Sequence, residues 1–306
     1  MRLAIVGAGA MGGVIGFYLA AVADVTLVDP WAEHVAAIAA RGLACERDGG
    51  AEARAVRATT DPAEAAPADA AIVLVKARQT PWAAEACRRA LAPDGVAYTL
   101  QNGVGNREVL AAALGEARAG QGVTALGGTL LGPGRVRHAG AGPTTLGAAP
   151  DPARAQALAA LLSAAGLPAA VSPDVEGLVW GKLVVNAGIN ALTALLRVPN
   201  GALAETPEAR ALLEAAVAEA AAVAAARGVA LPYADPAAHA LAVARATGAN
   251  RSSMLQDALR GAPTEVASIN GAIAREGARL GVPTPLNAAL AALVEALDAT
   301  AGQRVG

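Results

Sequence analysis

Lysine is almost absent from this chain, which keeps it at only two positions, Lys76 and Lys182. Of the 24 lysine and arginine residues, the other 22 are arginines. A guanidinium stays charged at any accessible pH, whereas burial can shift a lysine ammonium into the range where it donates and recovers a proton. Lys182 is therefore the first candidate for a general acid. A genome biased toward alanine and arginine would also lose its lysines, so the neighbouring residues must decide.

Aromatic residues are also scarce, at 2% of a chain that is 55% hydrophobic, so the core must consist of alanine, valine and leucine. The net charge of −2 provides no basic field for nucleic acid, and we expect no such partner. No run of 18 or more uncharged apolar residues occurs, so we expect no membrane partner either.

The chain has only two cysteines, Cys45 and Cys87, and they lack the spacing of a metal site. No bound metal is expected. The N-terminus leads directly into a strand pattern, without a charged leader and cleavage site. We therefore expect a reduced, cytoplasmic protein in which both thiols are packed rather than reactive.

The first half of the chain alternates short apolar runs with amphipathic segments. The runs span residues 3–6, 25–28, 71–75 and 96–100 and are bounded by Gly, Pro or Asp. This alternation is typical of a doubly wound parallel sheet. Residues 121–146, rich in Gly, Thr and Val, predict added strands on the same sheet. A helix near 154–165 and a short strand near 169–171 complete this half.

Beyond Pro173 the sequence predicts helices alone. They are expected over residues 175–196, 207–228, 236–246, 265–280 and 286 to about 301. The predicted fold class is thus α/β plus all-α, with a dinucleotide-binding Rossmann domain over residues 1–172 and a helical substrate and catalytic domain over 173–306. Long alanine-rich faces, such as residues 211–226, either pair between subunits in a homodimer or pack internally.

A glycine-rich segment follows the first predicted strand and opens a helix. Its GxGxxG pattern consists of Gly7, Ala8, Gly9, Ala10, Met11 and Gly12. Such glycines make a tight turn and admit a pyrophosphate to the helix N-terminus, where free N–H groups favour negative charge. The pattern alone is weak evidence, but the strand before it, the helix after it and Asp29, 22 residues beyond Gly7, together predict a dinucleotide site.

Asp29 also bears on which dinucleotide binds. A carboxylate at the end of the second strand accepts hydrogen bonds from the ribose hydroxyls and repels a 2′-phosphate, which favours NAD(H) over NADP(H). The alternative is that Asp29 caps the helix that begins after Pro30. In that case it carries no information about the cofactor.

Two further polar segments end strands at the carboxyl edge of the sheet, where ligands lie in open parallel sheets. Lys76 ends the third predicted strand and faces the cofactor or the substrate, and we assign it to the cofactor site with Gln79. Asn102 ends the next strand and would bring an amide close to the nicotinamide or the reacting carbonyl. Alternatively, Asn102-Gly103 is an ordinary turn.

Lys182, Asn186 and Asn190 are spaced i, i+4 and i+8, which places them on one stripe of a helix. Asparagine is a poor residue inside a helix, and an exposed stripe in this chain would carry Arg and Glu. The alternative is that the two asparagines cross-brace buried helices. Ser253 and Glu265 lie in further polar segments that also fit a helix cap and an acidic first turn.

Taken together, these segments resemble the ketopantoate reductases, which reduce 2-dehydropantoate to pantoate for coenzyme A biosynthesis. The matching segments, in order from residue 7 to residue 271, are GAGAMG, VKARQ, QNGVG, GKLVVNAGINALTAL followed by PNG, NRSSMLQD and TEVASING. The resemblance implies a Rossmann domain joined to a helical domain like that of 6-phosphogluconate dehydrogenase, with substrate bound between them.

The resemblance also implies roles for single residues. Lys182 matches the general acid that protonates the C2 oxygen as hydride arrives, and Glu265 matches the acidic residue that positions this lysine. The residues matching those that line the substrate are Asn102, Asn186, Asn190, Asn200 and Ser253. The family usually employs NADPH and commonly has a basic residue near the end of the second strand, where this chain has Asp29.

We therefore expect reduction of a 2-keto acid by NAD(P)H, with ketopantoate as the first candidate. The nearest alternative is a relative that acts on another 2-keto or hydroxy acid, including oxidation with NAD. A dinucleotide-sensing protein without catalytic activity is a third reading. It would leave the set formed by Lys182, Asn186, Asn190, Ser253 and Glu265 without a role.

Overall fold

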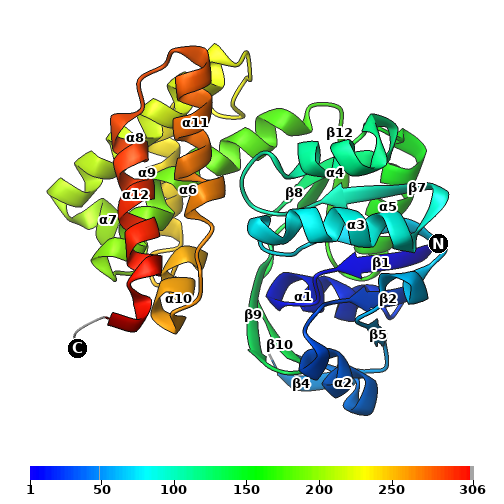
Figure 1. Ribbon diagram of the computed structural model, residues 1–306. Helices are drawn as coiled ribbons and strands as arrows, with labels where there is room; N and C mark the ends of the chain where they lie inside the picture. Colours follow the sequence, from blue (N-terminus) through cyan, green and yellow to red (C-terminus); the bar gives the residue numbers. More distant parts are fainter. Residues whose placement is uncertain (48, 304–306) are drawn as a thin grey trace. The chain divides into compact units, whose positions relative to one another are not determined.

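The computed structural model describes residues 1–47 and 49–303, and the chain divides into two compact units. One unit comprises Met1–Gln101 and Asn106–Val175. The other comprises the short segment Asn102–Gly105 and the chain from Glu176 onward. Figure 1 shows the sheets of the first unit in blue to green and the helices of the second in green to red.

The first unit contains an eight-stranded sheet in the order β12-β11-β8-β7-β6-β1-β2-β5. The strands are β1 Arg2–Val6, β2 Asp24–Val28, β5 Arg57–Thr59, β6 Ala68–Val73, β7 Leu91–Thr99, β8 Ala119–Thr124, β11 Thr144–Gly147 and β12 Ala169–Ser172. All neighbours are parallel except β8 and β11, which are antiparallel. The predicted doubly wound parallel sheet is confirmed.

Helices cover both faces of this sheet. They are α1 Ala10–Leu19, α2 Ala32–Arg41, α3 Thr80–Ala90, α4 Asn106–Leu114 and α5 Pro152–Ala164. Along β1, Leu3 and Ile5 lie in a core cluster with residues of α1 and α5, whereas Ala4 and Val6 lie in a second cluster with residues of α3 and α4. Because successive side chains of a strand point to opposite faces, β1 is apolar at every position from Leu3 to Val6.

A separate four-stranded sheet has the order β4-β3-β10-β9. Its strands are β3 Leu43–Arg47, β4 Gly50–Arg54, β9 Gly127–Gly132 and β10 Arg135–Gly140. The prediction that residues 121–146 extend one sheet is therefore wrong for β9 and β10. Strand β10 instead pairs in parallel with β3. Across this pair, Glu46 accepts hydrogen bonds from Arg135 and Arg137, which lie 89 and 91 positions away in the sequence.

Two predicted boundaries also differ from the structure. Strand β6 ends at Val73, so Lys76 lies in the turn after the strand, just before the 3₁₀ helix Ala77–Gln79. The helix predicted over residues 265–280 is divided into a 3₁₀ turn, η4 Val266–Ser268, and α11 Asn270–Leu280. The break is at Ile269, whose φ of −111° and ψ of −92° are not helical.

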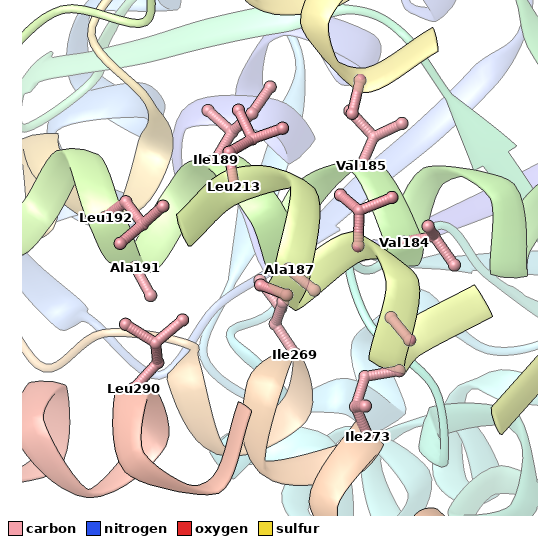
Figure 2. Packing of buried hydrophobic residues seen from close by; sticks show 14 of the residues in the cluster. Val184, Val185, Ala187, Ile189, Ala191, Leu192, Leu213, Ile269, Ile273 and Leu290 are labelled. Carbon is pink, nitrogen blue, oxygen red and sulfur yellow. The ribbon is translucent and has the colours of Figure 1, made fainter. Parts of the chain in front are cut away.

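The second unit is built from helices, and no strand occurs among the described residues after Ser172. The helices are α6 Val175–Leu196, α7 Ala202–Glu205, α8 Pro207–Ala226, α9 Pro236–Ala246, α10 Ser253–Arg260, α11 and α12 Pro285–Ala299. Figure 2 shows side chains of α6 packed with Leu213, Ile269 and Leu290 from other segments of this unit. Helix α6 is long and apolar enough to cross a membrane by length and composition, yet 72% of its most apolar window is buried within the protein.

Both cysteines are buried in the first unit, as expected for packed thiols. Burial raises the pKa of Cys87 to about 12 and also raises the pKa of Cys45. Neither thiol is therefore a thiolate at neutral pH.

Candidate active site

The glycine-rich loop between β1 and α1 is shaped by close backbone contacts. Gly7 has a φ of +96°, and a Cβ atom there would lie 2.6 Å from the amide nitrogen of Val75. A Cβ atom on Gly12 would overlap the carbonyl oxygen of Gly7. At Gly9, by contrast, nothing lies within 4 Å of such an atom, and no side chain caps α1. The loop therefore offers open space beside free N–H groups, which fits a dinucleotide pyrophosphate.

The Asp29 carboxylate lies against this loop. Its Oδ2 accepts from the Ala8 amide at 2.7 Å, and its Oδ1 accepts from the Trp31 amide at 2.9 Å. Helix α2 begins at Ala32 with Trp31 as N-cap, so Asp29 does not cap that helix directly. Each carboxylate oxygen can accept a second hydrogen bond, which leaves room for a ribose hydroxyl.

His34, which the sequence reasoning did not single out, braces the same loop. Its side chain is fully buried, with Nε2 3.0 Å from the Ala8 carbonyl oxygen and Nδ1 3.0 Å from the Gly134 amide. Because an amide can only donate, Nδ1 accepts and Nε2–H donates to Ala8, which specifies the neutral tautomer. The indole of Trp31 stacks on the ring, with centroids 5.1 Å apart. A lone histidine among apolar helix positions was the only local signal.

The segment that carries Lys76 and Gln79 follows β6 and lies next to the glycine loop, since Gly7 closely approaches Val75. Lys76 is half-buried at the N-cap of the 3₁₀ helix that ends at Gln79. Gln101, also not singled out, donates to the Val75 carbonyl at 2.8 Å and to the Thr80 hydroxyl at 3.0 Å. The structure thus brings the glycine loop, Asp29 and the Lys76 segment together at one end of the parallel strands.

In the helical unit, Lys182, Asn186 and Asn190 project from one stripe of α6. Asn190 is buried, and Lys182 and Asn186 are half-buried. The two amides donate no hydrogen bond to the rest of the described chain, whereas Asn270 and Asn287 are the asparagines that brace helices against one another. Asn186 and Asn190 therefore do not brace helices in the way that Asn270 and Asn287 do.

Lys182 has the electrostatic environment of a proton donor. Burial lowers its pKa to about 8, and the nearby Glu265 carboxylate opposes this change by favouring the charged ammonium. Glu265 lies directly before η4 and is half-buried. Thr264, next to it, donates from its amide and hydroxyl to Asp298 at 2.8 Å and 2.7 Å, which holds this end of the segment on α12.

Asn102 belongs to the helical unit through the segment Asn102–Gly105. Gly103 has a φ of +84°, and a Cβ atom there would overlap the Ser268 carbonyl oxygen, so the turn reading of Asn102-Gly103 is correct. The turn also fixes Asn102 on the segment that carries Glu265. Asn102 can therefore belong to a turn and still present its side-chain amide to a ligand.

The remaining two residues of the predicted substrate set differ in their surroundings. Ser253 is exposed at the first position of α10, and the neighbouring Ser252 is the cap, accepting from the Leu255 amide at 3.0 Å. Asn200 is buried and donates to the Thr247 hydroxyl at 2.9 Å, which joins its loop to the end of α9. In the described part of the chain, the hydrogen bonds that Asn200 donates lead to Thr247 and Asn250 and not to the Lys182 stripe.

The described residues contain no group of three or more His, Cys, Asp or Glu side chains that could hold a metal ion. The helical unit instead carries an ammonium, a carboxylate and amides on α6 and on the segments at Asn102 and Glu265, and the first unit carries a dinucleotide-type loop. This set is suited to hydride and proton transfer on a carbonyl compound.

Comparison with known proteins shows that the chain belongs to the ketopantoate reductase family. Residues 3–151 match the family model described as ketopantoate reductase PanE/ApbA, and residues 174–298 match the model of its C-terminal domain. The 2-dehydropantoate 2-reductase of Halobacterium salinarum is 39% identical over 299 residues, covering 96% of this chain and 98% of the relative. The 2-dehydropantoate 2-reductase of Archaeoglobus fulgidus is 36% identical over 299 residues, covering 97% of this chain and 98% of that relative.

Two solved structures are similar over nearly the whole chain. A PanE/ApbA family ketopantoate reductase from Ralstonia eutropha superposes with a TM-score of 0.92 at 37% identity, covering 99% of this chain and 100% of that one. A ternary structure of D-mandelate dehydrogenase with NADH and anilino(oxo)acetate also reaches 0.92, at 30% identity and with the same coverage.

Proposed function

Because the chain belongs to the ketopantoate reductase family, we propose that it catalyses the NAD(P)H-dependent reduction of a 2-keto acid, with 2-dehydropantoate as its substrate and pantoate as its product. The observation that carries this proposal is the environment of Lys182. Its pKa is lowered to about 8 by burial, it lies near Glu265, and it shares a helix stripe with two asparagine amides. A general acid is most effective when its pKa lies near the working pH.

In this reaction the bound nicotinamide supplies the hydride. The loop from Gly7 to Gly12 would hold the pyrophosphate on the N-terminus of α1, and Asp29 and Lys76 would contact the rest of the dinucleotide. Lys182 donates the proton from Nζ to the oxygen at C2 as negative charge develops there. The Glu265 carboxylate keeps the Lys182 ammonium charged and oriented.

The substrate carboxylate and hydroxyl need hydrogen-bond donors that do not compete with Lys182 for the proton. The amides of Asn186 and Asn190 supply such donors from α6, and Asn102 supplies one from the turn that rests on Ser268. Ser253 at the start of α10 supplies a hydroxyl. Neutral amides orient the anion without shifting the pKa of the acid as a second cation would.

We propose NAD(H) as the preferred dinucleotide. The Asp29 carboxylate lies against the glycine loop, where it would accept from ribose hydroxyls and repel a 2′-phosphate. The related D-mandelate dehydrogenase was solved with NADH, which supports this preference.

A second candidate is the interconversion of another 2-hydroxy acid and its 2-keto acid, in the direction of D-mandelate dehydrogenase. The observation that favours it is the high structural similarity to that enzyme over 99% of the chain, together with an acidic residue in place of a basic one after β2. Both candidates require the same proton-transferring lysine.

The deciding experiment follows absorbance at 340 nm with purified protein and either NADH or NADPH. Ketopantoate and phenylglyoxylate are compared as keto acids at matched concentrations. A ketopantoate kcat/KM at least about tenfold above that for phenylglyoxylate supports the first candidate, and the reverse ratio supports the second. Dinucleotide binding without turnover of either would contradict both.

A further inference from the structure

A chain of buried side-chain amides connects the segment that carries Glu265 to the helix that carries Lys182. Asn270, the first residue of α11, is fully buried. Its Nδ2 donates to the Ala187 carbonyl in the middle of α6 at 2.9 Å and to the Asn287 Oδ1 at 3.0 Å. Ala187 directly follows Asn186, so this bond attaches the 264–270 segment to the backbone of α6 beside the stripe.

The direction of every hydrogen bond in this chain is specified. A carbonyl can only accept, so Asn270 must present its NH₂ group to Ala187. Asn287 must then present its oxygen to Asn270, and its own NH₂ group donates to the Ala216 carbonyl at 3.0 Å and to Glu219 at 2.8 Å. The network therefore has one orientation across α8, α12, α11 and α6.

Glu219 fixes the far end of the network. Its carboxylate also accepts from the amides of Leu286 and Asn287, at 2.9 Å each, where α12 begins. A carboxylate at a helix N-terminus satisfies amides that have no partner within the helix. The amide chain is thus anchored on a helix end rather than on a mobile side chain.

The 264–270 segment has a second attachment at its other end. Thr264 donates twice to Asp298 of α12, and Ser268 donates back to the Glu265 carbonyl at 2.9 Å. Between these attachments, Val266 and Ile269 are buried in the same core cluster as α6. Glu265 consequently lies on a short segment that is tied at both ends.

Stability alone does not account for an amide at position 270. The Asn270 Oδ1 is buried without a hydrogen-bond partner in the described part of the chain. A buried polar atom left unpaired lowers stability, and a buried network can be replaced by apolar side chains of similar volume at little cost. The network does provide one thing that apolar packing does not, which is a single specified geometry.

We propose that Asn270 is a positioning residue for proton transfer, which sets the separation between Glu265 and Lys182 by attaching the 264–270 segment to α6. Thr264 supports the same geometry from the other end. The proposal rests on the proposed function for its catalytic meaning. Its geometric content, the Glu265–Lys182 separation, can be measured without any substrate.

The scarcity of lysine makes this measurement direct. Protein labelled with ¹³C-lysine gives side-chain NMR signals from Lys76 and Lys182 only, and Lys76→Arg assigns them. Among the charged groups in residues 49–303, Glu265 is the one whose charge raises the pKa of Lys182 against the effect of burial. A greater separation from Glu265 must therefore lower the titration midpoint of Lys182.

We expect Asn270→Ala to lower the Lys182 midpoint by several tenths of a pH unit, in the same direction as Glu265→Gln. Thr264→Val, which keeps the volume and the amide but removes the hydroxyl, is expected to give a smaller shift of the same sign and serves if Asn270→Ala does not fold. Thr144→Val is the matched control, because it removes a buried hydroxyl bond of 2.9 Å to Thr124 in the sheet of the other unit. It should lower the melting temperature without moving the midpoint.

Kinetics provide the second readout. In Asn270→Ala, kcat for keto acid reduction should fall at least about tenfold, because misplacement of a catalytic group by about 1 Å can cost about 10²-fold. The dissociation constant for the dinucleotide should stay within about twofold. Unchanged Lys182 midpoints in Asn270→Ala and in Thr264→Val, with only the melting temperature reduced, would overturn the proposal.

The two proposals fail separately. If the wild-type protein turns over neither keto acid but the variants shift the Lys182 midpoint, the proposed function is wrong and the positioning role of Asn270 stands. If the wild-type protein is active and the Lys182 midpoint does not move in the variants, the proposed function stands and the positioning role of Asn270 is wrong.

Discussion

The two units of this protein carry candidate functional groups of different kinds. In the first unit the site is mainly backbone: a loop shaped by Gly7 and Gly12, and a helix N-terminus without a side-chain cap. In the helical unit the site consists of side chains on α6 and of the 264–270 segment. A site made of backbone should be damaged by a substitution that adds a side-chain atom, whereas a site made of side chains should be damaged by a substitution that removes one.

Among the variants that test this difference, removal of the Lys182 ammonium should have the largest effect on activity. Lys182→Ala is expected to lower kcat at least about 10²-fold, because the developing alkoxide loses its proton donor. The dissociation constant for NADH should change little, since the dinucleotide loop lies in the other unit. Lys182→Arg is the informative companion, because it keeps the charge but does not release a proton at neutral pH. Near-normal turnover in either variant would remove Lys182 from the mechanism.

The pH dependence tests the same group without mutation. The protonated ammonium is the donor, so kcat for reduction should fall as pH rises through the Lys182 pKa of about 8, approaching about tenfold per pH unit above it. The stability effect has the opposite sign. The folded-state pKa lies below the ordinary value of 10.5, so the unfolded chain binds more protons between these two values and stability contributed by this group rises with pH there. Melting curves of wild type and Lys182→Met across pH 7 to 10 measure the difference.

Addition of one carbon atom should damage the backbone site. Gly12→Ala places a Cβ atom in the Gly7 carbonyl, so we expect a lower melting temperature together with at least about tenfold weaker dinucleotide binding. Gly9→Ala is the matched variant, because its Cβ atom meets nothing within 4 Å. It should keep the fold and weaken dinucleotide binding alone. Equal effects of the two variants on melting temperature would contradict this view of the loop.

The choice between dinucleotides should respond to Asp29. In Asp29→Asn the ratio of kcat/KM for NADH to that for NADPH is expected to fall several-fold, because the charge that repels a 2′-phosphate is removed. Asp24→Asn is the control, since Asp24 begins the strand that Asp29 follows and is exposed, with Arg57 as its ion-pair partner. A ratio that is unchanged in Asp29→Asn would mean that the carboxylate only braces the glycine loop.

The smallest effect is expected at His34. In His34→Gln the hydrogen bonds to Ala8 and Gly134 are weakened, so NADH should bind a few-fold less tightly while kcat stays nearly unchanged. His239→Gln is the control, because His239 is exposed and stacks on Tyr233 in the helical unit. Titration of NADH fluorescence with each variant gives the two dissociation constants.

Local patterns were the features that the sequence predicted well. The helices over 175–196 and 236–246 and the strand that precedes the glycine loop agree with the structure. Each is defined by apolar spacing or by capping residues within the element itself, such as Asp235, which accepts from the Ala238 amide at 2.9 Å. The candidate stripe on α6 follows from the same spacing, because residues four apart share a helix face.

Long-range pairings were the features that the sequence did not predict. The four-stranded sheet joins β3 and β4 to β9 and β10, and each strand is only five or six residues long, so nothing in either segment indicates the other. His34 has a hydrogen-bond partner 100 positions away, and Asn270 has one 83 positions away. A lone polar residue in an apolar pattern signals a buried bond but not its partner.

The sequence by itself determined the fold class, the glycine loop and the order of lysine and asparagines along one helix, because all of these depend on residues within a few turns of one another. Only the tertiary structure decided that Lys182 has a pKa near 8, that Asp29 and His34 hold the glycine loop, and that Asn270 ties the Glu265 segment to α6. The physical reason is that burial and hydrogen-bond partnership are properties of the packed chain. They arise when distant segments exclude water together and leave each buried donor to find an acceptor.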